Sequence, residues 1–266
     1  MSGDTAMSDP VRVERKEHVV TITLDDGSGE NRLSPDALAA LARAVDALRD
    51  DEETQAVVLT GAGREFFSAG ILNPAIRATF TKDEIIGLVR RANRLYDAVE
   101  MLPQIVICAL NGEARAGAAE LALTCDIRLA AEHASFRLPE ALWGGFPGAG
   151  GPVRLPRIVG RARALELICT GRPVAADEME RIGLVSSVYP AARLRDEAHG
   201  LAARIAASGP LATRGAKRIM HVHDAAGFAA ARALSDALRH ALEWSADVDE
   251  GMAAHREGRA PRFRGR

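Results

Sequence analysis

NGEARAGAAELALTCDIRLA, residues 111–130, predicts a turn, then a helix, then a strand, and it carries one residue of unexpected chemistry. Glu120 lies in the helical part, among small and apolar side chains. The positions three and four residues away hold Ala116, Gly117, Leu123 and Thr124, none of which is positively charged. A buried carboxylate without a partner is costly, so its pKa rises instead. The stretch therefore identifies Glu120 as a candidate functional residue.

Strands and helices alternate on both sides of this stretch. Runs of β-branched and apolar residues predict strands at 19–24, 56–60, 105–110, 126–130 and 184–189. Ser34 followed by Pro35 predicts one helix start, and Thr81 with Glu84 three residues later predicts another through a capping box. Helices that alternate with buried strands indicate an α/β fold with parallel strands.

The second half of the chain is predicted to be mostly helical. Residues 137–151, RLPEALWGGFPGAGG, are predicted to form an irregular loop. Helices are predicted near 161–170, 175–182, 192–208, 210–220 and 225–245. The apolar positions of the last helix, among them Phe228 and Leu238, suit a contact between subunits.

Composition excludes several classes of protein. The 266 residues suit one large domain or a domain with an appended piece, and a net charge of -2 argues against nucleic-acid binding. No run approaches the ~18 apolar residues that span a membrane, so no membrane partner is expected. Residues 1–10 contain no secretory signal and are predicted to form a flexible tail of a cytoplasmic protein.

Cysteines and histidines give no sign of a metal site. Cys108, Cys125 and Cys169 are predicted to be reduced core residues, because their number and spacing fit neither disulfides nor zinc. The seven histidines do not cluster with carboxylates, so no metal is expected. The stretch AVVLTGAGREF, residues 56–66, suggests a nicotinamide oxidoreductase through its G-x-G, but Phe66 occupies the third glycine position of that fingerprint.

Three segments together resemble the enoyl-CoA hydratase/isomerase (crotonase) family. They are FFSAG followed by Ile71, the stretch at 111–130, and ASFRLPEALWGGFPGAGG at 134–151, in matching order and spacing. The resemblance implies a crotonase-like spiral of ββα units over residues 1–200. It also implies a helical C-terminal region, residues 201–266, that is used in oligomerisation. A homotrimer or a homohexamer is the expected assembly.

The resemblance also implies a substrate and a site. The family acts on acyl thioesters of coenzyme A, so the partner is an acyl-CoA and no separate cofactor is expected. The backbone N–H groups of Ile71 and Gly117 are implied as an oxyanion hole. The residues implied in substrate binding are Ala69, Gly70, Leu72, Trp143 and Gly148.

Glu120 and Glu140 match the two glutamates that hold one water in the hydratases of this family. The implied reaction is hydration of a 2-enoyl-CoA to a 3-hydroxyacyl-CoA, with one carboxyl as base and the other as acid. A Δ3,Δ2-enoyl-CoA isomerase that relies on one glutamate, another reaction of the family, and a non-catalytic CoA-binding protein stay open. So does the pathway, fatty-acid metabolism included.

The chain departs from the family pattern in its first loop, where Ile71 and Leu72 replace smaller or acidic residues. The identity of the acyl group on the substrate therefore stays open. Arg115 could meet a CoA phosphate, but the favoured prediction is that it points into solvent. The arginine-rich end, represented by Arg259, is either a solvated basic segment or a contact for CoA phosphates on a neighbouring subunit.

Overall fold

The computed structural model describes residues 9–266, and within them the strands form two sheets. The larger sheet has the order β1-β2-β3-β5-β7-β10. Its strands are β1 (Val11–Lys16), β2 (Val19–Leu24), β3 (Ala56–Gly61), β5 (Ile105–Leu110), β7 (Ile127–Ala131) and β10 (Ser187–Tyr189). Apart from the antiparallel β1–β2 pair, neighbouring strands run parallel. The predicted α/β fold with parallel strands is confirmed, while the predicted tail falls almost wholly outside the described residues.

A smaller sheet, which the sequence analysis missed, has the order β4-β6-β8-β9. Its strands are β4 (Phe66–Ser68), β6 (Glu113–Arg115), β8 (Ser135–Arg137) and β9 (Val174–Ala175). Strands of two or three residues are too short to show a period of two in the sequence. In the chain, β4 follows β3, β6 follows β5, and β8 follows β7, each pair before a helix. This repetition is the expected succession of ββα units.

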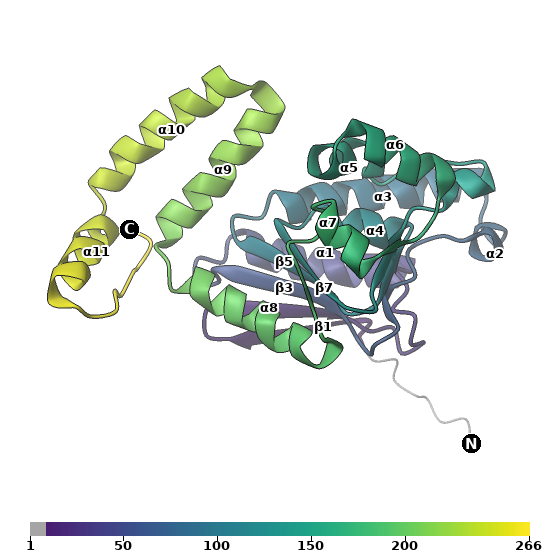
Figure 1. Ribbon diagram of the computed structural model, residues 1–266, viewed down its shortest axis with the longest axis horizontal. Helices are drawn as coiled ribbons and strands as arrows, with labels where there is room; N and C mark the ends of the chain where they lie inside the picture. Colours follow the sequence, from purple (N-terminus) through teal and green to yellow (C-terminus); the bar gives the residue numbers. More distant parts are fainter. Residues whose placement is uncertain (1–8) are drawn as a thin grey trace.

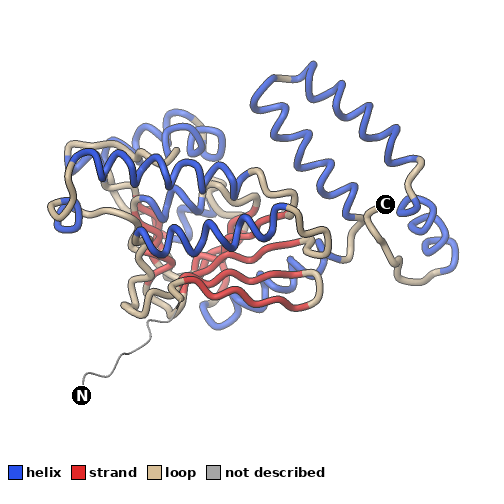
Figure 2. The backbone as a smooth tube through the Cα atoms, turned by 180° about the vertical axis from the view of Figure 1, so that it is seen from behind, coloured by secondary structure: helices blue, strands red, loops and turns tan. Residues whose placement is uncertain are grey.

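Helices α1 (Pro35–Arg49) and α3 (Lys82–Glu100) cover one face of the larger sheet, and α8 (Ala191–Ala206) covers the other (Figures 1 and 2). The predicted helix starts are confirmed. The Ser34 hydroxyl accepts a hydrogen bond from the Ala37 N–H, and Thr81 and Glu84 form a reciprocal capping box. Helix α3 matters for the site because it lies close to both of the loops that form it.

Shorter helices complete the core. They are α2 (Pro74–Arg77), α4 (Gly117–Ala122), the 3₁₀ turn η1 (Glu140–Trp143), α5 (Gly151–Val159), α6 (Arg161–Thr170) and α7 (Ala176–Arg181). No helix was predicted between the loop at 137–151 and residue 161, and α5 was missed because Pro156 and the glycines preceding it obscure its helical pattern. The prediction that Cys169 belongs to the core was also wrong, because α6 turns this thiol outward.

The helices α9 (Pro210–Ala226), α10 (Phe228–Glu243) and α11 (Ala246–Glu257) stand apart from the two sheets (Figure 1). One anchor to the core is the buried Lys217, whose ammonium donates to the Asp126 carboxylate at 2.7 Å and to the Gln104 carbonyl at 2.9 Å. Phe228 and Trp244 are 73% and 81% exposed, which suits the predicted role in oligomerisation without testing it. Across residues 9–266, every helix is too short or too polar to cross a membrane.

Candidate active site

Helix α4 begins at Gly117 through an unusual backbone conformation. Ala116, immediately before it, has φ 52° and ψ -127°, a region that costs a residue with a Cβ atom of the order of 1–3 kcal/mol. Such strain persists where the surroundings hold it in place, and the Ala116 N–H donates to the Arg137 carbonyl across the smaller sheet at 2.9 Å. The turn brings Gly117 to the surface of a cavity and leaves Glu120 facing the loop that follows η1.

The two N–H groups predicted to form an oxyanion hole lie on adjacent segments. A Cβ atom on Gly70, which has φ 86°, would lie 3.2 Å from the Gly117 nitrogen and 2.4 Å from the Arg115 carbonyl oxygen. Glycine is therefore required for this approach. Within residues 9–266, neither the Ile71 N–H nor the Gly117 N–H donates to another protein group. Two such donors on neighbouring segments can stabilise a negatively charged oxygen.

Glu120 has partners that the sequence did not reveal. Its side chain is 2% exposed, and its Oε1 accepts hydrogen bonds from the backbone N–H groups of Ala149 at 2.8 Å and Gly151 at 2.7 Å. A Cβ atom on Gly151 would lie only 3.1 Å from that oxygen. The missing side chain of Gly151 therefore leaves room for the carboxyl of Glu120. The second oxygen, Oε2, makes no hydrogen bond with residues 9–266.

Both predicted glutamates have raised pKa values. Burial raises the pKa of Glu120 from 4.5 to about 8, against the lowering effect of the Gly151 N–H, and the charge of Glu140 adds to the rise. Burial likewise raises the pKa of Glu140 from 4.5 to about 7. The Glu140 Oε2 is buried and has no hydrogen-bond partner within the described residues. Two carboxyls of this kind are typical of acid–base sites.

A cavity of about 500 Å³ joins these groups. Among the predicted site residues, its lining includes Ile71, Leu72, Gly117, Glu120, Glu140, Trp143 and Gly148. Ala69 and Gly70 are not among the lining residues, although Gly70 permits the close approach of the two segments; a contact with substrate stays a prediction for both. Phe80, Ile85 and Val89 also line the cavity, although no motif in the sequence marked them as site residues. Arg77 and Lys82 add positive charge to the wall.

Arg115 does not simply point into solvent, and that prediction was wrong. Its guanidinium binds the Glu113 carboxylate through two hydrogen bonds and lies 5.4 Å from the centre of the Phe66 ring. The arrangement holds two strands of the smaller sheet side by side, because Phe66 is on β4 and Glu113 is on β6.

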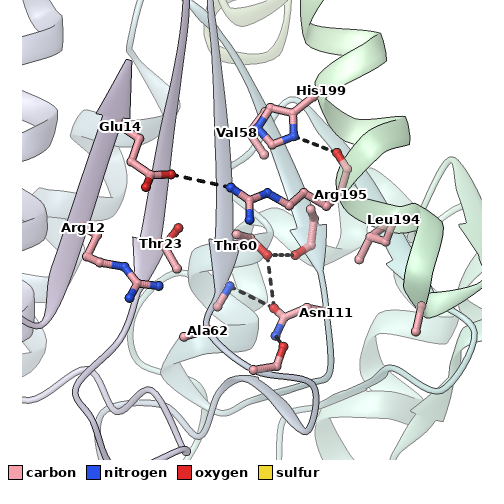
Figure 3. Close-up of a pocket in the computed structure, with 14 residues that line it drawn as sticks. Arg12, Glu14, Thr23, Val58, Thr60, Ala62, Asn111, Leu194, Arg195 and His199 are labelled. Atoms are coloured by element: carbon pink, nitrogen blue, oxygen red, sulfur yellow. Dashed lines mark hydrogen bonds and ion pairs between the residues drawn. The ribbon is translucent and has the colours of Figure 1, made fainter. Parts of the chain in front are cut away.

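A second cavity, of about 270 Å³, lies between the larger sheet and α8 (Figure 3). Its polar side chains are already satisfied by one another: Arg195 faces the Glu14 carboxylate at 3.6 Å, and Thr60 contacts Asn111 (Figure 3). Arg12 in the same cavity pairs with Asp25 at 2.9 Å. The cavity around Glu120 differs, because neither Glu120 nor Glu140 forms an ion pair within the described residues, and this cavity is the candidate active site.

Within residues 9–266, no three His, Cys, Asp or Glu side chains lie close enough together to bind a metal ion. The pair Glu120 and Glu140 is the chemically distinctive feature of the cavity. It can accept and donate protons without further groups.

Known proteins are similar to this chain in sequence and in overall fold. The sequence model of the family described as enoyl-CoA hydratase/isomerase matches residues 14–266. The short-chain-enoyl-CoA hydratase of Clostridium acetobutylicum is 35% identical over 215 residues, 79% of this chain and 80% of its own length. The 2,3-dehydroadipyl-CoA hydratase of Escherichia coli is 32% identical over 254 residues, 96% of this chain and 98% of its own. The crystal structure of an enoyl-CoA hydratase from Bacillus anthracis superposes with a TM-score of 0.93 at 36% identity, covering 97% of this chain and all of that one.

Proposed function

The chain belongs to the enoyl-CoA hydratase/isomerase family, and we propose that within it the protein hydrates a 2-enoyl-CoA thioester to a 3-hydroxyacyl-CoA. The observation that carries the proposal is one cavity lined by two carboxyls, the buried Glu120 and the half-buried Glu140, both with pKa values raised by desolvation. Movement of a double bond requires one group that carries a proton. Addition of water requires a base for the water and an acid for the carbon, which favours a pair.

The proposed reaction uses groups that already lie around the cavity. The thioester oxygen accepts hydrogen bonds from the Ile71 and Gly117 N–H groups, which stabilise the enolate that forms as water adds to Cβ. The ionised member of the glutamate pair takes a proton from the water. The protonated member delivers a proton to Cα. The pair ends with the same total charge, so no cofactor beyond the coenzyme A of the substrate is required.

The carboxyl oxygens that do not bind protein are the ones that act on water. Oε2 of Glu120 has no protein partner within residues 9–266, and no side chain or backbone group of another residue there donates to the carboxyl of Glu140. Because Oε1 of Glu120 is held by two N–H groups, its other oxygen has a defined direction. A catalytic group that is already oriented toward its reactant contributes a large part of the rate enhancement of an acid–base step.

The test is the ultraviolet absorbance of the conjugated thioester in crotonyl-CoA and in a longer 2-enoyl-CoA, mixed with the purified protein. Hydration removes the conjugation, so we expect the band to fall with time. Mass spectrometry should show a gain of one water per acyl-CoA. Binding without any change in either acyl-CoA, or conversion of 3-enoyl-CoA alone, would contradict the proposal and favour a CoA-binding protein or an isomerase, respectively.

The pH dependence of hydration follows from the two raised pKa values. Below about 7 both carboxyls are protonated and the base is lost; above about 8 both are ionised and the acid is lost. We therefore expect kcat/KM to peak at pH 7 to 8 and to fall on both sides. Initial rates measured across this range with crotonyl-CoA check the expectation. A rate that stays constant from pH 5 to pH 7 would show that no carboxylate with a raised pKa takes part.

The assembly is part of the proposal. We propose that three copies associate through the exposed apolar side chains of α10 and its neighbours, Phe228 and Trp244 among them. Sedimentation equilibrium of the purified protein distinguishes a monomer of 28.3 kDa from a trimer or a hexamer.

A further inference from the structure

The loop that holds Glu120 is itself held by α3. Asn93 on α3 donates its side-chain N–H to the Gly148 carbonyl at 2.8 Å. Asp97 and Glu100, one and two turns further along the same face of α3, bind Arg154 at 2.6 and 2.7 Å. Arg154 in turn reaches back to the loop. The face of α3 formed by Asn93, Asp97 and Glu100 is therefore a support for residues 148–151.

Arg154 makes the decisive contact. Its side chain is 6% exposed, and its Nη1 donates to the Ala149 carbonyl at 3.2 Å. The guanidinium lies directly over Gly150, which has φ 103°, since a Cβ atom there would be 2.0 Å from Nη1. In the chain, the Ala149 carbonyl lies between the Ala149 N–H and the Gly151 N–H. That carbonyl belongs to the Ala149–Gly150 peptide plane, which joins the two planes that carry the N–H groups binding Glu120, so holding it limits how far those two groups can turn.

We propose that Arg154 is a positioning residue for the reaction: it ties the Ala149 carbonyl to α3 and thereby aims the free oxygen of Glu120 into the cavity. The kinetic part of this inference rests on the proposed hydration. The structural part does not, because it concerns the loop and Glu120 alone.

Arg154 also affects the charge state of Glu120. The groups that face Glu120 are Glu140 from η1, Tyr96 from α3 and Arg154 from α5. The guanidinium lowers the pKa of Glu120, as do the N–H groups of Ala149 and Gly151, against the larger effect of burial. Removal of Arg154 withdraws one lowering charge and loosens two lowering hydrogen bonds. The pKa of Glu120 then rises, so the acid that Glu120 supplies persists to higher pH.

The test uses Arg154→Met in the full-length protein, with Arg157→Met as the matched control. Arg157 is on the same helix but is half exposed and lies 4.0 Å from its nearest carboxylate. We expect Arg154→Met to lower kcat about 10- to 100-fold with little change in KM, as a displaced catalytic group does. The alkaline limb of the pH profile should move to higher pH. Arg157→Met should change neither.

Hydrogen exchange gives a readout that does not depend on activity. In Arg154→Met, the amides of Ala149 and Gly151 should exchange about 10-fold faster, while amides of the larger sheet keep their protection. Unchanged exchange of these two amides, or a loss of kcat that is equal at every pH, would overturn the inference. If no enoyl-CoA is hydrated even by the unaltered protein, the proposed function fails, and the exchange result still decides the role of Arg154.

A milder variant covers the case in which Arg154→Met does not fold. Asp97→Asn weakens the ion pair that holds Arg154 on its exposed side. The substitution is mild, because the Asp97 side chain is 67% exposed and no buried carboxylate loses its partner. We expect the same changes at smaller size, with faster exchange at Ala149 and Gly151. Arg154→Lys keeps the positive charge but loses the planar set of N–H donors that a guanidinium has. It should therefore restore the pH profile more fully than the exchange protection of the Ala149 and Gly151 amides. Normal exchange in Asp97→Asn together with an unchanged pH profile would count against the inference.

Discussion

Glu120→Gln is expected to lower kcat/KM for hydration about 1000-fold, within the 10²–10⁴-fold range of a lost acid–base group. Glutamine preserves the shape of the side chain, and its Oε1 can still accept the N–H groups of Ala149 and Gly151. The loss is therefore chemical, because the amide neither takes a proton from water nor supplies one to Cα. The measurement is the rate at which the absorbance of crotonyl-CoA falls. Residual activity above about one tenth would contradict the assigned role.

The same variant has a stability signature that confirms it is folded. A carboxyl whose pKa is raised from 4.5 to about 8 in the folded protein destabilises it progressively as pH rises through that interval, because the unfolded chain ionises first. Glutamine does not ionise, so Glu120→Gln should melt at a higher temperature than the unaltered protein at pH 9, by a few degrees. At pH 4, where the carboxyl is protonated in both states, the difference should be small. Glu132→Gln, an exposed site, is the matched control for both readouts.

Glu140→Gln is expected to reduce hydration by a similar factor, and it separates the hydratase from the isomerase. Oε2 of Glu140 has no protein partner in residues 9–266, so the substitution there breaks no hydrogen bond that holds the fold. Its effect should appear in the chemistry and in the pH profile, from which the limb near pH 7 should disappear. Hydration of a 2-enoyl-CoA and isomerisation of a 3-enoyl-CoA are measured side by side for both glutamate variants.

The pattern across the two variants decides the reaction. A hydratase needs both carboxyls, so Glu120→Gln and Glu140→Gln should each abolish most hydration. If isomerisation survives Glu140→Gln but not Glu120→Gln, and hydration by the unaltered protein is negligible, the protein is an isomerase and the proposed reaction is wrong. Similarity to named hydratases does not replace this measurement, because these relatives are named for different acyl groups.

Several parts of the site were accessible from the sequence because their signals are local. A charged residue in an apolar helix drew attention to Glu120, and the order of three segments added Glu140, Ile71 and Gly117. The cavity brings these four together. The longer strands other than β1 were also predicted, as were two helix caps, since β-branched runs and capping boxes are formed by residues close together in the sequence. The smaller sheet was missed because its strands are two or three residues long.

The sequence alone determined the α/β class, the resemblance to a family and the identity of the two glutamates, since each rests on residue types at short or regular spacing. Only the tertiary structure decided what those glutamates contact. The N–H groups that donate to Glu120 lie 29 and 31 residues further along the chain. The two carboxylates of α3 that bind Arg154 precede it by 54 and 57 residues. Hydrogen bonds to backbone atoms leave no pattern of side chains in the sequence, because every residue except proline offers the same N–H group.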